Sequence, residues 1–194
     1  DTFEGVVPKL VVHEGDRVDV GDALFVDKNF PEVKFASPVS GTVKAVERGE
    51  RRKILGIRLQ ADEVQKYHDF GRRDVSSLSS DDVKNALLEA GLFGYIYQLP
   101  YAVSTNPQTM PKAIFVSALR DMPLANDFEY ELQGNERDFQ TGLTALSKMA
   151  TTYLGIGKNQ KADVLVNAKD VLLGSKNSQF RLYGYDFQQN AYCD

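Results

Sequence analysis

Short apolar runs separated by turn residues fill the first third of the chain. Gly, Asp, Asn and Pro stand between the runs, as is typical of turns that join β-strands. None of the runs in residues 5–60 has the length and spacing of an amphipathic helix. The pattern therefore predicts a β region, with strands at Lys9–Val12, Ala23–Val26, Val33–Ala36, Gly41–Val46 and Leu55–Leu59.

The hydrophobic period changes after residue 76. Residues 79–82, Ser-Ser-Asp-Asp, offer N-cap oxygens and the early negative charge that a helix N-terminus favours. From Val83 to Ala90 the apolar residues then recur at i, i+3, i+4 and i+7, which places them on one helical face. Gly91 follows where a helix commonly ends in a left-handed residue. The spacing predicts a helix that starts within residues 79–82 and ends before Gly91.

A strand-helix-strand order follows. The continuous apolar run Ala113–Ala118 suits a strand covered on both faces of a sheet. Asn135 is the expected cap of a second helix, whose apolar face runs from Phe139 to Ala150, and Thr152–Ile156 is the next predicted strand. This order is typical of a parallel α/β sheet. Beyond Gly157 the pattern weakens, and residues 164–174 fit either a strand or a short helix.

These patterns predict a mixed α/β fold, in which an N-terminal β barrel-sandwich of the lipoyl-like hybrid type precedes a Rossmann-like α/β domain. We divide the chain into the barrel-sandwich at 1–62, a helical connector at 63–111, the Rossmann-like portion at 112–157 and an unassigned segment at 158–194. The chain begins just before a strand and without Met, so we expect it to be a piece of a longer protein. Residues 157–162 are not assumed to be contiguous in that protein.

Composition excludes several classes of protein. The net charge of −4 argues against a nucleic-acid binder, which is usually basic. The single cysteine, Cys193, permits no intrachain disulfide and no cysteine-ligated cluster. No apolar stretch approaches the roughly 20 residues that span a bilayer, and residues 1–10 show neither the basic nor the apolar region that we expect of a signal peptide.

Lys28 is the first candidate for chemistry. Barrel-sandwich carrier domains present a lysine on a tight hairpin, a few residues before a Ser-Pro-x-x-Gly turn, for lipoyl or biotinyl attachment. Lys28 precedes the turn Ser37–Gly41 in that order, but residues 29–31 crowd it and the interval to Ser37 is long for a carrier. A solvated lysine in a surface turn is the favoured interpretation, and a carrier module remains an alternative.

A basic cluster follows the turn. It consists of Arg48, Arg51, Arg52 and Lys53. Guanidinium groups suit carboxylate or phosphate recognition. Charged residues at a β-turn, however, more often form a solvated edge that blocks strand pairing, and both interpretations stay open.

The remaining signals for chemistry are weak. No glycine follows Ala113–Ala118 before Gly134, so the α/β unit lacks the usual phosphate-binding loop, and Gly155-Ile156-Gly157 alone is a weak signal. The two histidines, His13 and His68, lie apart from Cys193 and from any acidic cluster. We predict no self-contained catalytic site and no metal site, and we identify no cofactor-binding residues.

The run from Pro31 to Ile54, PEVKFASPVSGTVKAVERGERRKI, resembles the A-subunit family of the sodium-translocating NADH:quinone oxidoreductase. Further motifs of that family occur in the same order over residues 5–157, and two positions depart from its pattern: Gln98 replaces a usual arginine and Phe93 a usual tryptophan. The segments that resemble it are Val11–Val20, Ala90–Phe93, Leu99–Tyr101, Pro111–Ala118, Asp121–Ala125, Asp138–Leu143 and Leu146–Ser147.

The resemblance implies a peripheral subunit on the cytoplasmic face of the bacterial inner membrane, without a transmembrane helix in this chain. It implies a complex that couples electron transfer from NADH to ubiquinone with Na⁺ export, and it associates this chain with quinone reduction. The complex uses NADH, flavins, an iron–sulfur centre and quinone, but no cofactor bound by this chain is expected. The other subunits are the implied partners, with quinone as a candidate. The C-subunit family of the related electron-transport complex is a further alternative.

Four aromatic residues after the first helix are candidates for a quinone pocket, since such pockets are mostly apolar with a few polar groups. They are Phe93, Tyr95, Tyr97 and Tyr101. Aromatics at such positions more often form the core between a sheet and a helix, so the sequence selects none of them.

Overall fold

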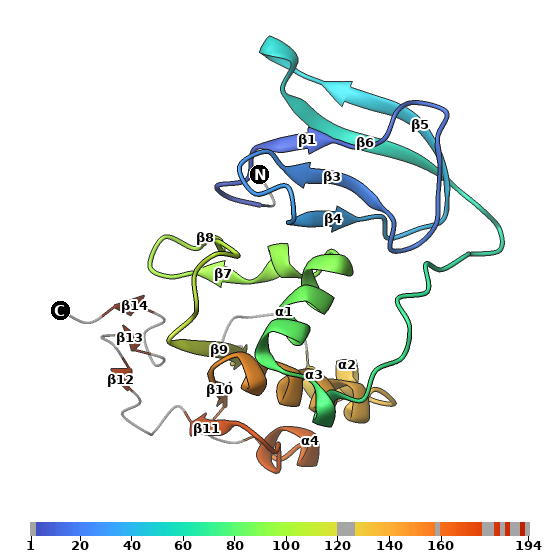
Figure 1. Cartoon of the computed structure of the whole chain (residues 1–194). Coiled ribbons are helices and arrows are strands. Elements are labelled where there is room, and N and C mark those ends of the chain that lie inside the picture. The colour runs from blue at the N-terminus through green and yellow to red at the C-terminus, as the bar shows by residue number, and fades with distance from the viewer. Residues whose placement is uncertain are drawn as a thin grey trace. The chain divides into compact units, whose positions relative to one another are not determined.

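The computed structural model describes residues 3–119, 127–157 and 160–175, together with the backbone of three two-residue strands near the C-terminus. The chain forms two compact units. Unit 1 contains the residues up to 73 and residues 84–109, and unit 2 contains residues 74–83 and those from 110 onward. Figure 1 labels most of the helices and strands along the chain.

Unit 1 is built on two three-stranded antiparallel sheets. The first has the order β1-β3-β4, and the second has the order β2-β5-β6. Their bounds are β1 Pro8–Leu10, β2 Arg17–Val18, β3 Ala23–Asp27, β4 Lys34–Ala36, β5 Gly41–Arg48 and β6 Ile54–Ala61. These sheets form the predicted barrel-sandwich.

The core of unit 1 follows from the alternation of side chains along its strands. Val18, Leu24 and Val43 are at most 7% exposed, and they form a cluster with Val12 from the loop after β1. A Cβ on Gly41 would lie well inside contact distance of the Gln60 carbonyl oxygen. Glycine at the start of β5 therefore allows β6 to approach closely.

The helix predicted after residue 79 is α1, Ser80–Glu89. The Ser79 N–H donates to the Asp82 carboxylate at 3.0 Å, and the Asp82 N–H donates to the Ser79 hydroxyl at 3.2 Å. This reciprocal pair is a capping box. Gly91 has a φ of +70°, which confirms the predicted left-handed residue after the helix.

Residues 90–105 pack as part of unit 1. They contain the 3-10 turn η3, Phe93–Tyr95, and an antiparallel hairpin of β7, Tyr97–Gln98, and β8, Val103–Ser104. The segment between the two predicted domains thus contains one α-helix and a hairpin that the sequence pattern did not predict. Two-residue strands are too short to show an alternating period.

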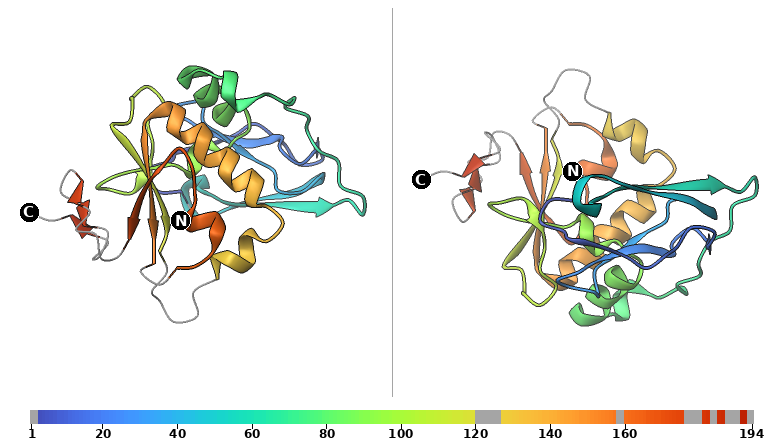
Figure 2. Two further views of the ribbon diagram at one scale, coloured as in Figure 1. Left: turned by 90° about the horizontal axis from the view of Figure 1, so that it is seen from below. Right: turned by 90° about the horizontal axis from the view of Figure 1, so that it is seen from above.

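Unit 2 holds a parallel sheet of the order β11-β10-β9. The strands are β9 Ala113–Ala118, β10 Thr151–Ile156 and β11 Leu172–Ser175. Helices α2, Phe128–Leu132, and α3, Glu136–Met149, lie between β9 and β10 in the chain, and α4, Asp163–Val166, precedes β11. Figure 2 shows α3 crossing one face of this sheet. The predicted parallel strand-helix-strand unit is confirmed.

The central strand β10 runs through the core of unit 2, and all of its residues after Thr151 are buried. Leu154 and Leu165 are fully buried, and Leu143 from α3 is 2% exposed in the same cluster. Residues 164–174, which fit either a helix or a strand, contain both: the last turn of α4 and then the start of β11. The backbone strands β12 Arg181–Leu182, β13 Tyr185–Asp186 and β14 Ala191–Tyr192 form a further antiparallel sheet.

Candidate functional site

The tyrosine segment, defined here as Leu92–Tyr101, is the candidate site of unit 1. Gly91 and Gly94 let it approach β4 closely. A Cβ on Gly91 would lie 3.0 Å from the Ala36 Cβ, and a Cβ on Gly94 would lie 2.5 Å from the Phe35 ring. A larger side chain at residue 94 would force the Phe35 ring or the segment to shift.

An aromatic stack underlies the tyrosine segment. Phe25 and Phe35 are cross-strand partners on β3 and β4, and their rings are stacked with centroids 4.5 Å apart. The Phe3 ring lies 4.5 Å from Phe35, and the Tyr95 ring meets Phe3 edge to face at 5.2 Å. Each such pair contributes about 0.5–1.5 kcal/mol beyond its buried area. The stack thus fixes one end of the tyrosine segment.

The four candidate aromatics separate into two groups. Phe93 is 3% exposed and belongs to the core, whereas Tyr95, Tyr97 and Tyr101 are 58%, 45% and 81% exposed. Leu92 adds a further exposed apolar side chain, at 52%. The sequence pattern missed Phe3, Phe25 and Phe35, whose rings pack under the segment. Contacts between rings that are far apart in the chain leave no periodic signal in the sequence.

The Ser-Pro-Val-Ser-Gly turn, residues 37–41, is held by a network of hydrogen bonds around Ser40. The Ser40 N–H donates to Gln65 Oε1 at 2.7 Å, and the Ser40 hydroxyl donates to Asp62 Oδ2 at 3.2 Å while accepting the Lys66 N–H at 2.9 Å. Arg17 Nη2 lies 2.6 Å from the same Asp62 oxygen. Ser40 is fully buried. This turn therefore joins the strands to the chain that leaves β6.

Lys28 lies in the turn between β3 and β4, and its side chain is exposed. Its backbone N–H donates to the Val7 carbonyl at 2.8 Å, beside the Pro8–Asp27 strand pair. The neighbouring Asp27 carboxylate accepts the Val7 and Asn29 N–H groups at 3.3 and 3.0 Å. The backbone of Lys28 is thus held against β1. Attachment of a lipoyl or biotinyl group to Lys28 stays an untested alternative.

The four cations of the basic cluster gather at the end of the β5–β6 hairpin, where η1, Glu50–Arg52, forms the turn. Arg48, Arg51, Arg52 and Lys53 are all exposed. Arg51 and Arg52 both have positive φ, at +53° and +61°. Arg58 pairs with Glu47 lower on the same hairpin, and this contact raises the pKa of Arg58.

The two histidines lie at separate places in unit 1. His13 is 89% exposed beside Asp16, and His68 Nδ1 lies 2.9 Å from Asp22 Oδ1 with its ring against Phe70. Within the described ranges no group of three His, Cys, Asp or Glu side chains gathers where it would hold a metal ion. Each histidine has a surface contact of its own, and the structure does not bring them together.

The α/β unit places Gly155 inside β10 and Gly157 directly after it. Gly155 pairs with Ser117 and Gly174 in the sheet, so it is a strand residue rather than part of a phosphate-binding turn. The resemblance at Asp121–Ala125 and the single Cys193 lie outside the described residues. None of the described helices has the length and apolar composition to cross a bilayer.

Comparison with known proteins finds relatives that share one name. The A subunit of the Na(+)-translocating NADH-quinone reductase of Pseudomonas aeruginosa (strain UCBPP-PA14) is 34% identical over 154 residues, which cover 78% of this chain and 35% of that protein. The protein of the same name from Glaesserella parasuis serovar 5 (strain SH0165) is 36% identical over 151 residues, covering 77% of this chain and 34% of the relative. The one from Yersinia pestis bv. Antiqua (strain Angola) is 34% identical over 151 residues, again 77% and 34%.

The chain spans about a third of the length of these relatives, since the matches cover 34–35% of them. Two family models match it in succession. The NqrA N-terminal barrel-sandwich hybrid domain matches residues 1–62, and the NqrA second alpha/beta domain matches residues 78–176. Together they cover the barrel-sandwich, the tyrosine segment and the parallel sheet, and the chain belongs to the NqrA family.

Proposed function

We propose that this chain serves within the NqrA-type subunit of a sodium-translocating NADH:quinone oxidoreductase, which couples electron transfer from NADH to quinone with Na⁺ export. The observation that supports this most strongly is the succession of two NqrA domains over residues 1–62 and 78–176. The relatives that carry the name cover the same stretch of chain. The other subunits of that complex are the proposed partners, at the cytoplasmic face of the membrane.

We assign the chain to the end of the complex where quinone is reduced. The support is the tyrosine segment, in which Tyr95, Tyr97 and Tyr101 are exposed on a base of packed phenylalanines. A tyrosine offers an apolar ring for stacking on a quinone and a hydroxyl that donates to a quinone carbonyl. The segment would bind and orient the quinone head group.

The proposal includes no flavin or iron–sulfur centre held by this chain. Two features of this sequence support this: one cysteine cannot ligate a cluster, and no glycine occurs between β9 and Gly134, so a flavin dinucleotide would lack the usual close approach to the backbone. Electrons would then reach the quinone from cofactors on other subunits. In this scheme Tyr95, Tyr97 and Tyr101 would position the quinone head group.

Of the alternatives, the C-subunit family of the electron-transport complex is not favoured, because both matching domains are those of NqrA. A carrier role for Lys28 has a direct test in intact mass spectrometry of the protein from its own host. An added mass of a lipoyl or biotinyl group on Lys28 would establish the carrier role.

A photoreactive quinone analogue tests the assignment to the quinone end. We expect it to label the tyrosine segment of the assembled complex, and Tyr101→Ala to reduce the labelling and to raise the KM for quinone. Tyr130→Ala is the matched control, since Tyr130 is 79% exposed against 81% for Tyr101 and lies on α2. Labelling that is equal in both variants, or that occurs wholly on other subunits, would contradict the assignment.

A further inference from the structure

We propose that the basic tip, defined as Arg48–Leu55 at the end of the β5–β6 hairpin, docks on an anionic lipid surface. The inference concerns a part of unit 1 that the quinone assignment does not use. It rests on the shape of the hairpin, its charge, one exposed leucine and its backbone conformation. It does not depend on the proposed function.

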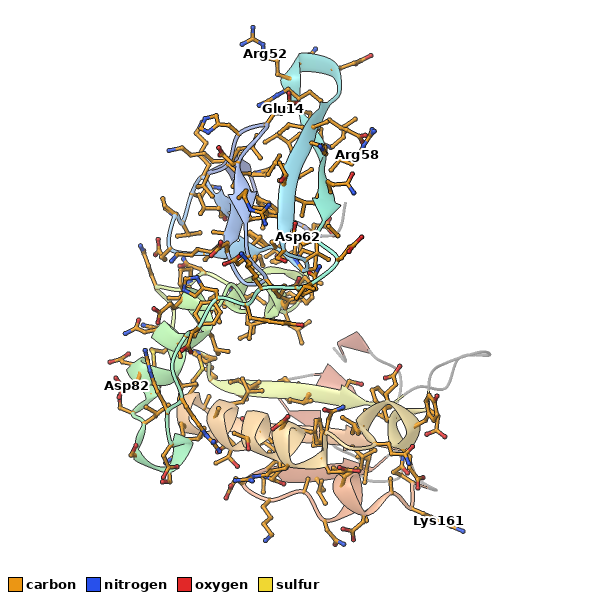
Figure 3. The ribbon with its side chains drawn as sticks, turned by 90° about the vertical axis from the view of Figure 1, so that its right-hand side faces the viewer. Glu14, Arg52, Arg58, Asp62, Asp82 and Lys161 are labelled. Carbon is orange, nitrogen blue, oxygen red and sulfur yellow. The ribbon has the colours of Figure 1, made fainter. Side chains whose placement is uncertain are left out.

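The hairpin ends as a two-stranded ribbon. β2 pairs with β5 only at Thr42 and Gly41, whereas β5 and β6 continue to pair with each other as far as Arg48 and Ile54. Among the described strands, none lies beside the last pairs of this ribbon. Figure 3 shows Arg52 at its outer end, beyond Glu14 and Arg58. The turn therefore projects into solvent beyond the three-stranded part of the sheet.

The charge of the tip is opposite to that of the chain. The tip contains Arg48, Arg51, Arg52 and Lys53 against the single acid Glu50, while the whole chain has a net charge of −4. At physiological salt, charges interact over about 8 Å. An anionic surface in contact with the tip is therefore attracted by the cations of the tip, and salt screens its repulsion by acidic residues farther away. Each basic residue close to an anionic leaflet raises the affinity about fivefold.

Leu55 adds an apolar contact beside these cations. It is 65% exposed, and a Cβ on Gly49 would lie 3.1 Å from its side chain, so Leu55 is held against the turn. A cationic rim with an exposed leucine is the combination that binds at the boundary of headgroups and acyl chains. An acidic peptide would be attracted by the cations alone, whereas a lipid surface also takes up the exposed leucine. The leucine therefore favours a lipid surface as the occupant.

The backbone of the turn supports a role for its side chains. Arg51 and Arg52 both occupy the left-handed region, which glycine and asparagine adopt at lower cost than arginine. Such a backbone conformation persists only where the surrounding structure enforces it, and residues that adopt it concentrate at functional sites. Two successive arginines at such positions place two guanidinium groups on one exposed turn.

Sedimentation of the 194-residue chain with lipid vesicles tests the inference. At low salt the chain should bind vesicles in which about one lipid in three is phosphatidylglycerol, and not vesicles of phosphatidylcholine alone. The variant R51Q/R52Q/K53Q should lose about 100-fold in partition, and Leu55→Ser several-fold. Because Lys53 has a further contact, R51Q/R52Q alone is measured as well, with an expected loss of about 25-fold.

The matched control is R72Q/R137Q/K161Q, which removes the same charge from exposed residues outside the hairpin. It should change partition by less than about threefold. Circular dichroism verifies that every variant is folded. The inference is overturned if phosphatidylglycerol vesicles do not bind the chain, or if the control variant loses as much as the tip variant. Binding of polyglutamate that depends on the tip, without binding of vesicles, would overturn it in favour of an acidic protein partner.

Discussion

Gly94 lies so close to Phe35 that a Cβ at position 94 would be 2.5 Å from the Phe35 ring. This relationship joins η3 to strand β4 and places the tyrosine segment on the barrel-sandwich. Phe35 is itself 3% exposed between Phe25 and Phe3. The ring is enclosed on several sides, so it has little room to move away from a larger residue 94.

Gly94→Ala is therefore expected to lower the free energy of unfolding by about 1–3 kcal/mol, as overpacking does in a close-packed core. The measurement is urea unfolding followed by tyrosine fluorescence. Gly142→Ala is the control, because Gly142 lies inside α3 with nothing within 4 Å of a Cβ. The control should raise stability by about 0.5–1 kcal/mol. Equal effects at the two glycines would show that Phe35 does not confine residue 94.

Leu154→Ala is expected to destabilise unit 2 by about 2–5 kcal/mol, because Leu154 is fully buried in the central strand and the substitution leaves a cavity. Leu172→Ala removes the same atoms from a side chain that is 52% exposed on the neighbouring strand. It should cost less than about 1 kcal/mol. Thermal unfolding compares the two variants, and similar losses would mean that the core does not centre on β10.

Arg52→Asn is expected to raise the free energy of unfolding by about 0.5–1 kcal/mol, because asparagine tolerates the left-handed conformation better than arginine. The same change should weaken binding to anionic vesicles. Arg72→Asn is the control, because Arg72 is also exposed but is not among the described residues that have a positive φ. If Arg52→Asn lowered stability instead, the left-handed backbone would not be a source of strain.

Asp74 should make stability depend on pH. Its carboxylate accepts the Ser76 N–H at 3.0 Å, and this bond, with a smaller effect of Lys148, lowers the pKa of Asp74 below its usual value. A carboxylate with a lowered pKa stabilises the fold above its unfolded pKa of about 4, and the contribution is lost as pH falls through the folded pKa.

Asp74→Asn keeps an acceptor oxygen but removes this charge. Its free energy of unfolding should lie below that of the parent near neutral pH and approach it as the pH falls below about 4. Urea unfolding at a series of pH values measures the difference. A gap that stays constant across the series would show that the charge of Asp74 is not its source.

The sequence pattern predicted the larger elements because they have enough residues to show a period. β5 spans Gly41–Arg48 and α3 spans Glu136–Met149, and both were expected with ends shifted by a few residues. A cap within residues 79–82 and the left-handed Gly91 were predicted from local chemistry, and both are confirmed, with Ser79 as the cap. Asn135 occupies the expected N-cap position of α3, but its side chain makes no capping hydrogen bond; Glu136 instead accepts the Gly134 N–H at 3.0 Å.

The site was predicted less completely than the fold. Tyr95, Tyr97 and Tyr101 were named as candidates, but the sequence did not separate them from the buried Phe93. Exposure in a segment of short turns and two-residue strands depends on which strand it packs against, and that contact is set by Phe35, more than fifty residues earlier in the chain. The resemblance to the family supplied the proposed function, because the sequence showed no catalytic motif that would have done so.

The measurement that tests the central claim most directly is the Na⁺-stimulated NADH:quinone reductase activity of membranes from the native host. The gene is deleted, then restored with an affinity tag. We predict that deletion abolishes the Na⁺-stimulated activity, that the tagged protein restores it, and that the activity co-purifies with the tag. Unchanged Na⁺-stimulated activity after deletion, or a tagged protein that purifies without it, would contradict the assignment.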